Sequence, residues 1–416
     1  MALAALIIAI ETATGAGAAG DGLRATLPLL GRTVVEHQAR QAVGAGATHL
    51  VLLVERMPSA LTAALDRLRR DGVSIEVART IGDAADRFHP DERLLLIADG
   101  CVADQVMLDM LAMQPAPALM TVPDQPDTVE YERIDAQCRW AGLGVLDGAA
   151  VRSTAAMLGD WDAQSTLLRR AVQAGARRVA CAPAADGRPR IAIRHQALDG
   201  LDRQLLRGSR VPAGRWPRRW LFALVDGPVA GWLARKAVDP WPVAIASVGL
   251  AGVGVLLALA GWVGTGFGFG LSSGPVAAVA ARLARVRLAD IRHGAMIERA
   301  RAGALALGLL ALAWPLGGVW LLAGAGAVAC VMATRSALHG LAALSDDAGP
   351  PWIAEADGLA WGMMPVALVA GWTGAVAAGL LYGLASFVRM QAMFVAAARQ
   401  APRGAARDAD HGDPAV

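Results

Sequence analysis

The longest stretch of this chain without a charged residue is Pro240–Ala281, which reads PWPVAIASVGLAGVGVLLALAGWVGTGFGFGLSSGPVAAVAA. A helix needs roughly 20 consecutive apolar residues to cross the hydrocarbon core of a bilayer. The stretch is therefore long enough for two membrane-spanning helices. We predict a turn between them near Gly261–Gly268, where glycines cluster.

Two further stretches contain no Asp, Glu, Lys or Arg: Ala302–Thr334, and Gly358–Met390 apart from Arg389. Each holds two spans if the helices extend past the charges at their cytosolic ends. The turns would then lie near Pro315–Gly318 and Gly371–Gly374. We predict an all-α domain of six transmembrane helices, and four spans is the alternative.

The charges between these stretches predict the orientation, because cytoplasmic loops carry an excess of Arg and Lys. With six spans and the N-terminus inside, Arg235 and Lys236 precede the first helix, and all three outer turns are uncharged. Both termini are then cytosolic, in a bacterial-type inner (plasma) membrane. The loop between the second and third helices carries Arg282, Arg285, Arg287, Arg292, Arg299 and Arg301.

The composition supports a soluble part joined to a membrane part. The 416 residues are 55% hydrophobic and 18% charged, with a mean hydropathy of +0.42. That is too apolar for a soluble enzyme and too charged for a bare channel. A net charge of only +3 disfavours a nucleic-acid-binding protein, and the four cysteines lack the spacing of a zinc site or a disulfide framework.

Residues 1–205 have the pattern of a cytosolic α/β domain, in which short apolar runs alternate with helical patterns. This alternation predicts a largely parallel sheet. Residues 206–239 mix Trp with Arg, which is typical of an amphipathic helix at the membrane interface. The six-span domain would then cover 240–400, and the polar residues 401–416 would form a disordered tail. The predicted strands are Leu3–Ile10, His49–Val54, Ser74–Val77, Arg93–Ala98 and Ala118–Val122, and the predicted helices include Thr33–Val43 and Ser59–Arg70.

A GxGxxG pattern follows the first predicted strand, with its glycines at Gly15, Gly17 and Gly20. Such a loop lets backbone N–H groups approach a phosphate. Four residues separate it from the strand, however, and Pro28 lies where a dinucleotide-binding fold has its first helix. We interpret the loop as a candidate nucleotide-phosphate site together with Arg24 and Asp99, and not as a dinucleotide fingerprint.

Three segments carry a resemblance to the sugar-phosphate nucleotidyltransferases. The segment Arg24–His37 is similar to the family's KxLLPVxGxPLLEH motif, Leu94–Cys101 to the strand that ends in Gly-Asp, and Trp140–Asp147 to the NAGIYVF strand. The resemblance implies an α/β, Rossmann-like nucleotidyltransferase fold. It also implies a phosphate cradle, a lysine and carboxylates for Mg²⁺ as the catalytic groups.

The chain departs from that pattern at the catalytic positions. Arg24 occupies the lysine position, and Cys101 occupies the position of the Gly-Asp aspartate. Asp99, two residues earlier, is the available substitute. The second acidic position falls near Arg190–His195, which contains no carboxylate.

The order of an α/β domain, an interfacial helix and a six-span domain resembles the fusions of an inositol-phosphate cytidylyltransferase with a CDP-alcohol phosphatidyltransferase. That family carries DxxDGxxARx₈GxxxDxxxD, whose four aspartates hold two metal ions. Here Ala284–Arg285 matches the AR pair, and Gly294 has the required spacing. The four aspartate positions are then Ala277, Ala280, Glu298 and Ala302.

Three of the four metal ligands are therefore missing, and Arg285, Gly294 and Glu298 form a vestigial motif with no metal expected. We expect Glu298 to form an ion pair with Arg301 or Arg285. The arginines around it could bind an anionic headgroup or a diphosphate. This candidate headgroup site consists of Arg282, Arg285, Arg287 and Arg292.

Two hypotheses follow for the function. The first is a non-catalytic protein of phospholipid metabolism that binds a phospholipid or a CDP-linked lipid precursor, as a homodimer or with an active homologue, because dimers are usual in the family it resembles. The second is an active CDP-alcohol phosphotransferase with a non-standard Mg²⁺ site. The carboxylates available to such a site are Asp290, Glu298, Asp346, Asp347, Glu355 and Asp357.

Overall fold

The computed structural model describes residues 2–13, 22–157, 162–181, 188–193, 198, 200–209, 215–289, 293–342 and 349–400. The chain forms two compact units. The first comprises Met1–Ser209, Gly231–Val238 and Arg285–Ala289, and the second comprises Arg210–Ala230, Asp239–Ala284 and Asp290–Val416. We describe each unit by itself.

The first unit is built around an eight-stranded sheet with the strand order β11-β8-β10-β6-β1-β4-β5, to which β9 adds by pairing with β10. The central strand β1 reads LAALII and is buried along its whole length. A continuous apolar run is typical of a strand that is covered on both faces. The strands are β1 (Leu3–Ile8), β4 (Ala47–Leu53), β5 (Ile75–Ala78), β6 (Arg93–Ile97), β8 (Ala118–Pro123), β9 (Glu132–Arg133), β10 (Cys138–Asp147) and β11 (Arg177–Ala180).

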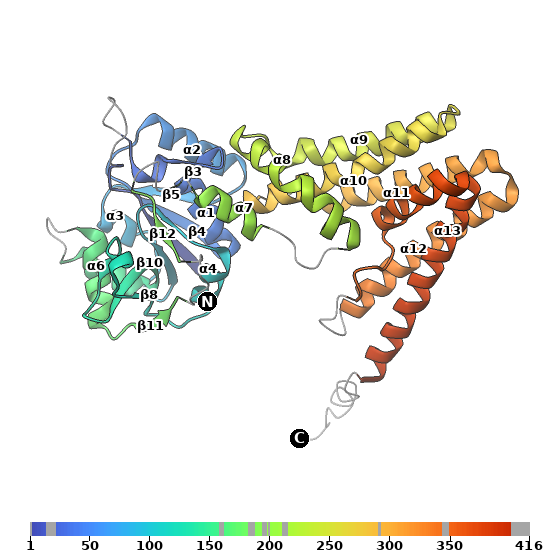
Figure 1. Cartoon of the computed structure of the whole chain (residues 1–416). Helices are drawn as coiled ribbons and strands as arrows, with labels where there is room; N and C mark the ends of the chain where they lie inside the picture. The colour runs from blue at the N-terminus through green and yellow to red at the C-terminus, as the bar shows by residue number, and fades with distance from the viewer. Residues whose placement is uncertain are drawn as a thin grey trace, which may run out of the picture. The chain divides into compact units, whose positions relative to one another are not determined.

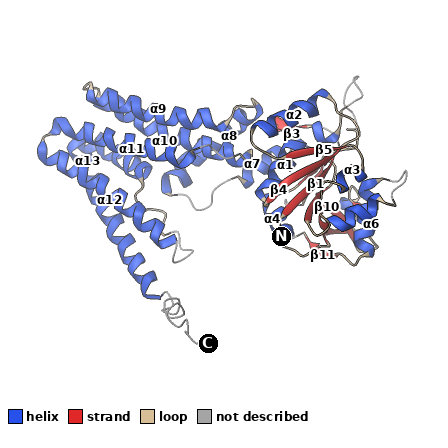
Figure 2. Ribbon diagram, turned by 180° about the vertical axis from the view of Figure 1, so that it is seen from behind, coloured by secondary structure: helices blue, strands red, loops and turns tan. Residues whose placement is uncertain are grey.

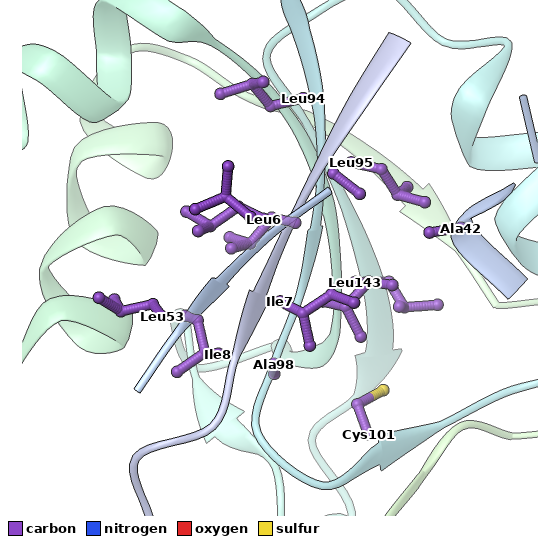
Figure 3. Close-up of a cluster of buried hydrophobic side chains, with 14 of the residues drawn as sticks. Leu6, Ile7, Ile8, Ala42, Leu53, Leu94, Leu95, Ala98, Cys101 and Leu143 are labelled. Carbon is purple, nitrogen blue, oxygen red and sulfur yellow. The ribbon is translucent and has the colours of Figure 1, made fainter. Parts of the chain in front are cut away.

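Helices cover both faces of this sheet, with α1 and α4 on one side and α3 and α6 on the other (Figures 1 and 2). The core between the layers includes Leu6, Ile7 and Ile8 of β1 with Leu94 and Leu95 of β6, all nearly inaccessible to solvent (Figure 3). The helices are α1 (Val34–Gly44), α2 (Ser59–Arg70), α3 (Ile81–Ala85), α4 (Gln105–Ala112), α5 (Gly148–Ala155), α6 (Ala163–Gln173) and α7 (Leu201–Gly208).

The predicted positions of the strands and helices agree with these bounds, but the prediction of a largely parallel sheet needs correction. The sheet is mixed, because β10 runs antiparallel to β6, β8 and β9. The pairs β1–β4, β1–β6, β4–β5 and β8–β11 are parallel. Periodicity identifies a strand but carries no information on the direction of its neighbour.

The second unit is helical. A π-helical segment, η4 (Pro217–Phe222), leads into α8 (Ala223–Arg235), whose last residues belong to the first unit. The remaining helices are α9 (Pro240–Leu259), α10 (Val263–Val286), α11 (Gly294–Ala313), α12 (Gly318–Ala342) and α13 (Ala356–Gln400), with a short 3₁₀ helix, η5 (Trp314–Leu316), between α11 and α12.

The described part of the chain holds four helices, not six, that are long and apolar enough to cross a membrane: Pro240–Leu259, Val263–Val286, Gly318–Leu341 and Ala356–Arg399. Helix α11 is 20 residues long, but Glu298, Arg299 and Arg301 lie in its first turns. The last two predicted spans lie in α13, where two helices meet at Gly371 (φ 66°, ψ −173°), within the predicted turn at Gly371–Gly374, and α13 counts as one candidate span. The six-span prediction is therefore replaced by four candidate spans.

Glycines allow α9 and α10 to pack backbone against backbone. A Cβ atom at Gly266 of α10 would lie 2.5 Å from the carbonyl oxygen of Gly254 in α9 and 2.8 Å from the backbone nitrogen of Ala258. Small residues permit this close approach between membrane helices, where van der Waals contact supplies much of the association. Gly268, on the same helix, has nothing within 4 Å of its Cβ position.

This packing predicts opposite effects for two identical substitutions. Gly266→Ala forces the two backbones apart and should destabilise the protein by about 1–3 kcal/mol. Gly268→Ala meets no neighbour and should be neutral or stabilising by up to about 1 kcal/mol through helix propensity. Thermal unfolding in detergent compares the two variants, and equal melting temperatures would contradict the close contact.

Candidate functional site: an arginine-lined cleft

In the first unit, two candidate residues, Arg24 and Asp99, lie near the point where β1 and β6 end. Because these strands are parallel neighbours, their carboxyl ends reach the same edge of the sheet. Asp99 follows β6, and its Oδ2 accepts a hydrogen bond from the backbone nitrogen of Glu11 at 2.6 Å. Arg24 lies 3.8 Å from the carboxylate of Glu11. Arg24 and Asp99 therefore both lie beside Glu11.

Asp99 faces inward at this edge. It is 2% exposed, and its Oδ1 atom has no hydrogen-bond partner among the described residues. Burial raises the pKa of its carboxyl group to about 7, although the backbone hydrogen bond from Glu11 and the charge of Arg24 act to lower it. This carboxylate binds the end of β1, which is a structural role.

The two segments that the resemblance aligns with the acidic positions of nucleotidyltransferases, around Cys101 and around Arg190, also lie together. The short strands β7 (Cys101–Val102) and β12 (Arg190–Ile191) pair antiparallel, so that Ile191 lies opposite Cys101. Cys101 is buried, and burial raises the pKa of its thiol to about 12. Neither residue is a ligand that Mg²⁺ prefers, and Arg194 and His195 of the predicted segment lie outside the described residues. The predicted phosphate loop with Gly15, Gly17 and Gly20 lies outside the described residues.

The described arginines of the predicted headgroup site form hydrogen bonds to other residues of the protein. Arg282 is 4% exposed and donates a hydrogen bond of 2.5 Å to Asp226. Arg285 donates to the carbonyl of Ser209 at 3.0 Å, and Arg287 donates to the carbonyl of Ala234 at 2.9 Å. These three side chains are therefore engaged with protein groups, and Arg292 lies outside the described residues.

Glu298 forms the predicted ion pair with Arg301, at 2.7 Å. The same guanidinium, which is 1% exposed, also makes two hydrogen bonds to Asp357, at 2.7 and 2.9 Å. Arg218 lies 3.4 Å from Glu298 and 3.7 Å from Asp357. Two carboxylates and two guanidinium groups therefore neutralise each other at the start of α11 and α13.

We call Arg218, Glu298, Arg301 and Asp357 the ion cluster. Residues of α10 pack against it. Arg301 also donates to the hydroxyl of Ser273 on α10, at 3.4 Å. The next residue, Gly274, leaves room for the carboxylate, because a Cβ there would lie 2.8 Å from Oδ1 of Asp357. This part of α10 thus lies beside the cluster.

The described residues do not form the metal site that an active phosphotransferase would need. No group of three or more His, Cys, Asp or Glu side chains among them is placed to hold a metal ion. The oxygens of Glu298 and Asp357 face Arg301, and the aligned positions Ala277 and Ala280 offer no ligand. Asp290, Asp346 and Asp347 lie outside the described residues, and the described residues do not fit two metal ions.

A large cleft opens beside the ion cluster, with a volume of about 1,070 Å³. Its polar residues come from η4, the start of α11, the end of α12 and the region around the start of α13. Its remaining walls are apolar and include Val255, Phe267, Leu305, Leu309, Val328 and Met332. The cleft is therefore charged in one part and apolar in the rest, as an amphiphilic ligand requires.

Positive charge exceeds negative charge in this cleft. Five arginines line it against three carboxylates, and His339 lies beside them; the arginines are Arg215, Arg218, Arg299, Arg301 and Arg335, and the carboxylates are Glu298, Glu355 and Asp357. Arg299 and Arg335 are exposed and, within the described part of the chain, have no carboxylate partner. These two guanidinium groups can bind an anion.

Sequence reasoning did not select Arg215, Arg335 or His339 as binding residues, although their charges were visible at the ends of apolar stretches. The available signal was their position, because Arg335 and His339 lie one turn apart on α12 and thus share a face. Their relation to α11 required the packing of the helices.

Comparisons with known proteins add a likeness of fold. No protein-family model and no curated protein matches the sequence. A solved structure of a protein from Bacillus anthracis, assigned as a glucose-1-phosphate thymidylyltransferase and in complex with a sucrose, is similar over 48% of this chain and 93% of that chain. The identity is 13% and the TM-score is 0.36, so we draw nothing about activity from this likeness.

The buried carboxyl group of Asp99 predicts a pH dependence of stability. The pKa of this group in the folded protein is about 7, above the ordinary value of 3.8. The unfolded chain therefore gives up the proton at a lower pH than the folded protein does. The contribution of Asp99 to the free energy of unfolding is complete at low pH and is lost as the pH rises towards 7. The Asp99→Asn variant has no carboxyl group at this position, so it does not lose stability in this way. The stability of the variant relative to wild type should therefore rise between pH 4 and pH 7, by up to about 4 kcal/mol.

Thermal unfolding at several pH values measures this difference. Asp91→Asn is the matched control, because the side chain of Asp91 is 81% exposed. A difference curve for Asp99→Asn that stays flat from pH 4 to pH 7 would contradict the assignment.

The ion cluster predicts a large effect for loss of its central cation. Arg301→Leu leaves the buried carboxylate of Asp357 without its main partner, which should cost about 3–5 kcal/mol of stability. Arg299→Leu, two residues away on an exposed side chain, should have little effect. Equal melting temperatures of the two variants in detergent would show that Arg301 does not hold the helices together.

Proposed function

We propose that this protein is a membrane protein of phospholipid metabolism that binds an anionic phospholipid or a CDP-linked lipid precursor without converting it. The single observation that carries the proposal is the cleft of about 1,070 Å³ with apolar walls and two arginines, Arg299 and Arg335, that have no carboxylate partner among the described residues. Acyl chains match the apolar walls, and a phosphate or diphosphate matches the two positive charges in excess.

The ion cluster supports the non-catalytic part of the proposal. In the family that the helical unit resembles, two metal ions clamp the leaving nucleotide and activate the incoming hydroxyl. In this chain, Arg301 lies between the carboxylates of Glu298 and Asp357. A guanidinium can attract a phosphate, but it cannot supply the coordination sites that activate a hydroxyl.

The finer parts of the proposal concern ancestry, orientation and assembly. We infer that the chain descends from a nucleotidyltransferase fused to a CDP-alcohol phosphatidyltransferase, and that both termini face the cytosol because the arginines flank the apolar stretches on one side. A regulatory role fits such a protein, acting as a homodimer or together with an active homologue. Cross-linking in membranes, followed by mass spectrometry, tests the assembly.

The decisive experiment combines turnover and binding. Purified protein in nanodiscs is incubated with CDP-diacylglycerol, a panel of acceptor alcohols and Mg²⁺ or Mn²⁺, and the release of CMP is measured. We expect no CMP above a protein-free blank and an increase in melting temperature on addition of CDP-diacylglycerol. Turnover that disappears with a chelator would establish the alternative, an active phosphotransferase.

The cleft also predicts which arginine matters for binding. Arg335→Gln removes one of the two exposed cations of the cleft and should weaken the binding of CDP-diacylglycerol by about tenfold, the effect of losing one charge-assisted hydrogen bond. Arg389→Gln is the matched control, because Arg389 is exposed on α13 and does not line the cleft. Titration by thermal shift compares the variants, and equal affinities would place the headgroup elsewhere.

A further inference from the structure

A second, smaller pocket of the helical unit is lined mainly by aromatic rings. Its volume is about 390 Å³, within the range of small-molecule sites. Trp216 and Trp220 of the η4 region, Trp352 before α13 and Tyr382 of α13 surround it. The pocket shares only Met363 with the arginine-lined cleft, so the following inference does not rest on the proposed function.

Hydrogen bonds hold three of these four aromatic residues in place. Nε1 of Trp216 donates to the hydroxyl of Tyr382 at 2.9 Å, and that hydroxyl donates to the carbonyl of Trp352 at 2.6 Å. The polar atoms of Trp216 and Tyr382 are thereby used within the pocket. The apolar atoms of the rings remain as the surface that a ligand can contact.

Small residues give a ligand space between these rings. Gly362 and Gly379 line the pocket, and a Cβ at Gly362 would lie only 3.7 Å from the ring of Tyr382. The other lining residues are Met363 and Ala378, so none of the lining residues carries a formal charge. The pocket is an aromatic cage with an uncharged floor.

Aromatic faces attract cations, and one ring of this cage already does so. The guanidinium of Arg219 lies 5.8 Å from the ring centroid of Trp220, a distance typical of a cation–π interaction. A primary ammonium or a guanidinium inside the pocket would lose hydrogen bonds to water, and the lining side chains offer no free carboxylate to replace them. A quaternary ammonium has no N–H group and does not incur this cost.

We propose that the cage formed by Trp216, Trp220, Trp352 and Tyr382 is a binding site for a quaternary ammonium group of the choline type. The trimethylammonium head contacts the ring faces, and its substituent extends towards solvent past the partly exposed rings of Trp220 and Trp352, which are 55% and 43% exposed. A choline-bearing lipid and a soluble choline compound carry the same head.

The first test compares choline with its neutral carbon analogue, 3,3-dimethylbutanol. Titration calorimetry uses the full chain in a maltoside detergent, which contains no quaternary ammonium. Choline should bind about tenfold more tightly than the neutral analogue, because only the charged head gains the cation–π attraction. Equal affinities, or no binding of choline, would overturn the proposal.

The second test uses variants at the edge of the cage. Trp352→Leu keeps an apolar side chain but removes a ring face, and should weaken choline binding about tenfold, whereas Trp352→Phe keeps a ring and should retain part of the affinity. Trp232→Leu is the control, because Trp232 is also 55% exposed but does not line the pocket. Unchanged choline binding in a folded Trp352→Leu variant would contradict the proposal, and Trp352→Phe decides the matter if Trp352→Leu does not fold.

A third arm distinguishes the source of the ligand. The titration with choline is repeated in nanodiscs of phosphatidylglycerol alone and in nanodiscs that also contain phosphatidylcholine. Loss of choline binding only in the second kind shows that a lipid headgroup fills the cage. Equal binding in both shows that the cage takes soluble choline compounds from the aqueous side.

Discussion

The guanidinium of Arg301 is the group on which the helical unit depends. A cation that is 1% exposed is costly to remove from water, and it is stable only where carboxylates surround it. Asp357 and Glu298 meet that need, and Ser273 and Gly274 adapt α10 to it. Three helices are thereby joined at one point. The carboxylates of Glu298 and Asp357, which could otherwise bind a metal ion, are paired with the guanidinium of Arg301.

The electrostatic character of the cleft depends on this neutralised cluster. Because Glu298 and Asp357 are balanced by Arg301 and Arg218, they do not repel an anion, and the exposed charges of Arg299 and Arg335 set the sign of the field. The aromatic cage on the other side of Met363 has the opposite preference, since π faces attract cations. The two pockets therefore favour ligand groups of opposite charge.

In the α/β domain, too, the nearest carboxylate is engaged with the protein itself. The short strands β7 and β12 place Cys101 opposite Ile191, and neither side chain carries a carboxylate. Asp99, the nearest carboxylate, is turned inward to hold the backbone of Glu11. Apolar burial maintains this sheet, and Asp99 adds a hydrogen bond at its edge.

The sequence by itself determined the local elements. The strand near residues 3–8, the helices near 34–44 and 59–70, the apolar stretches and the Glu298–Arg301 pair all follow from patterns within a few residues. Tertiary structure decided the direction of β10, the count of four candidate spans and the pairing of Arg301 with Asp357, 56 residues away. Periodicity and i,i+3 spacing are local properties of the backbone, whereas the partner of a buried charge depends on which helices pack together.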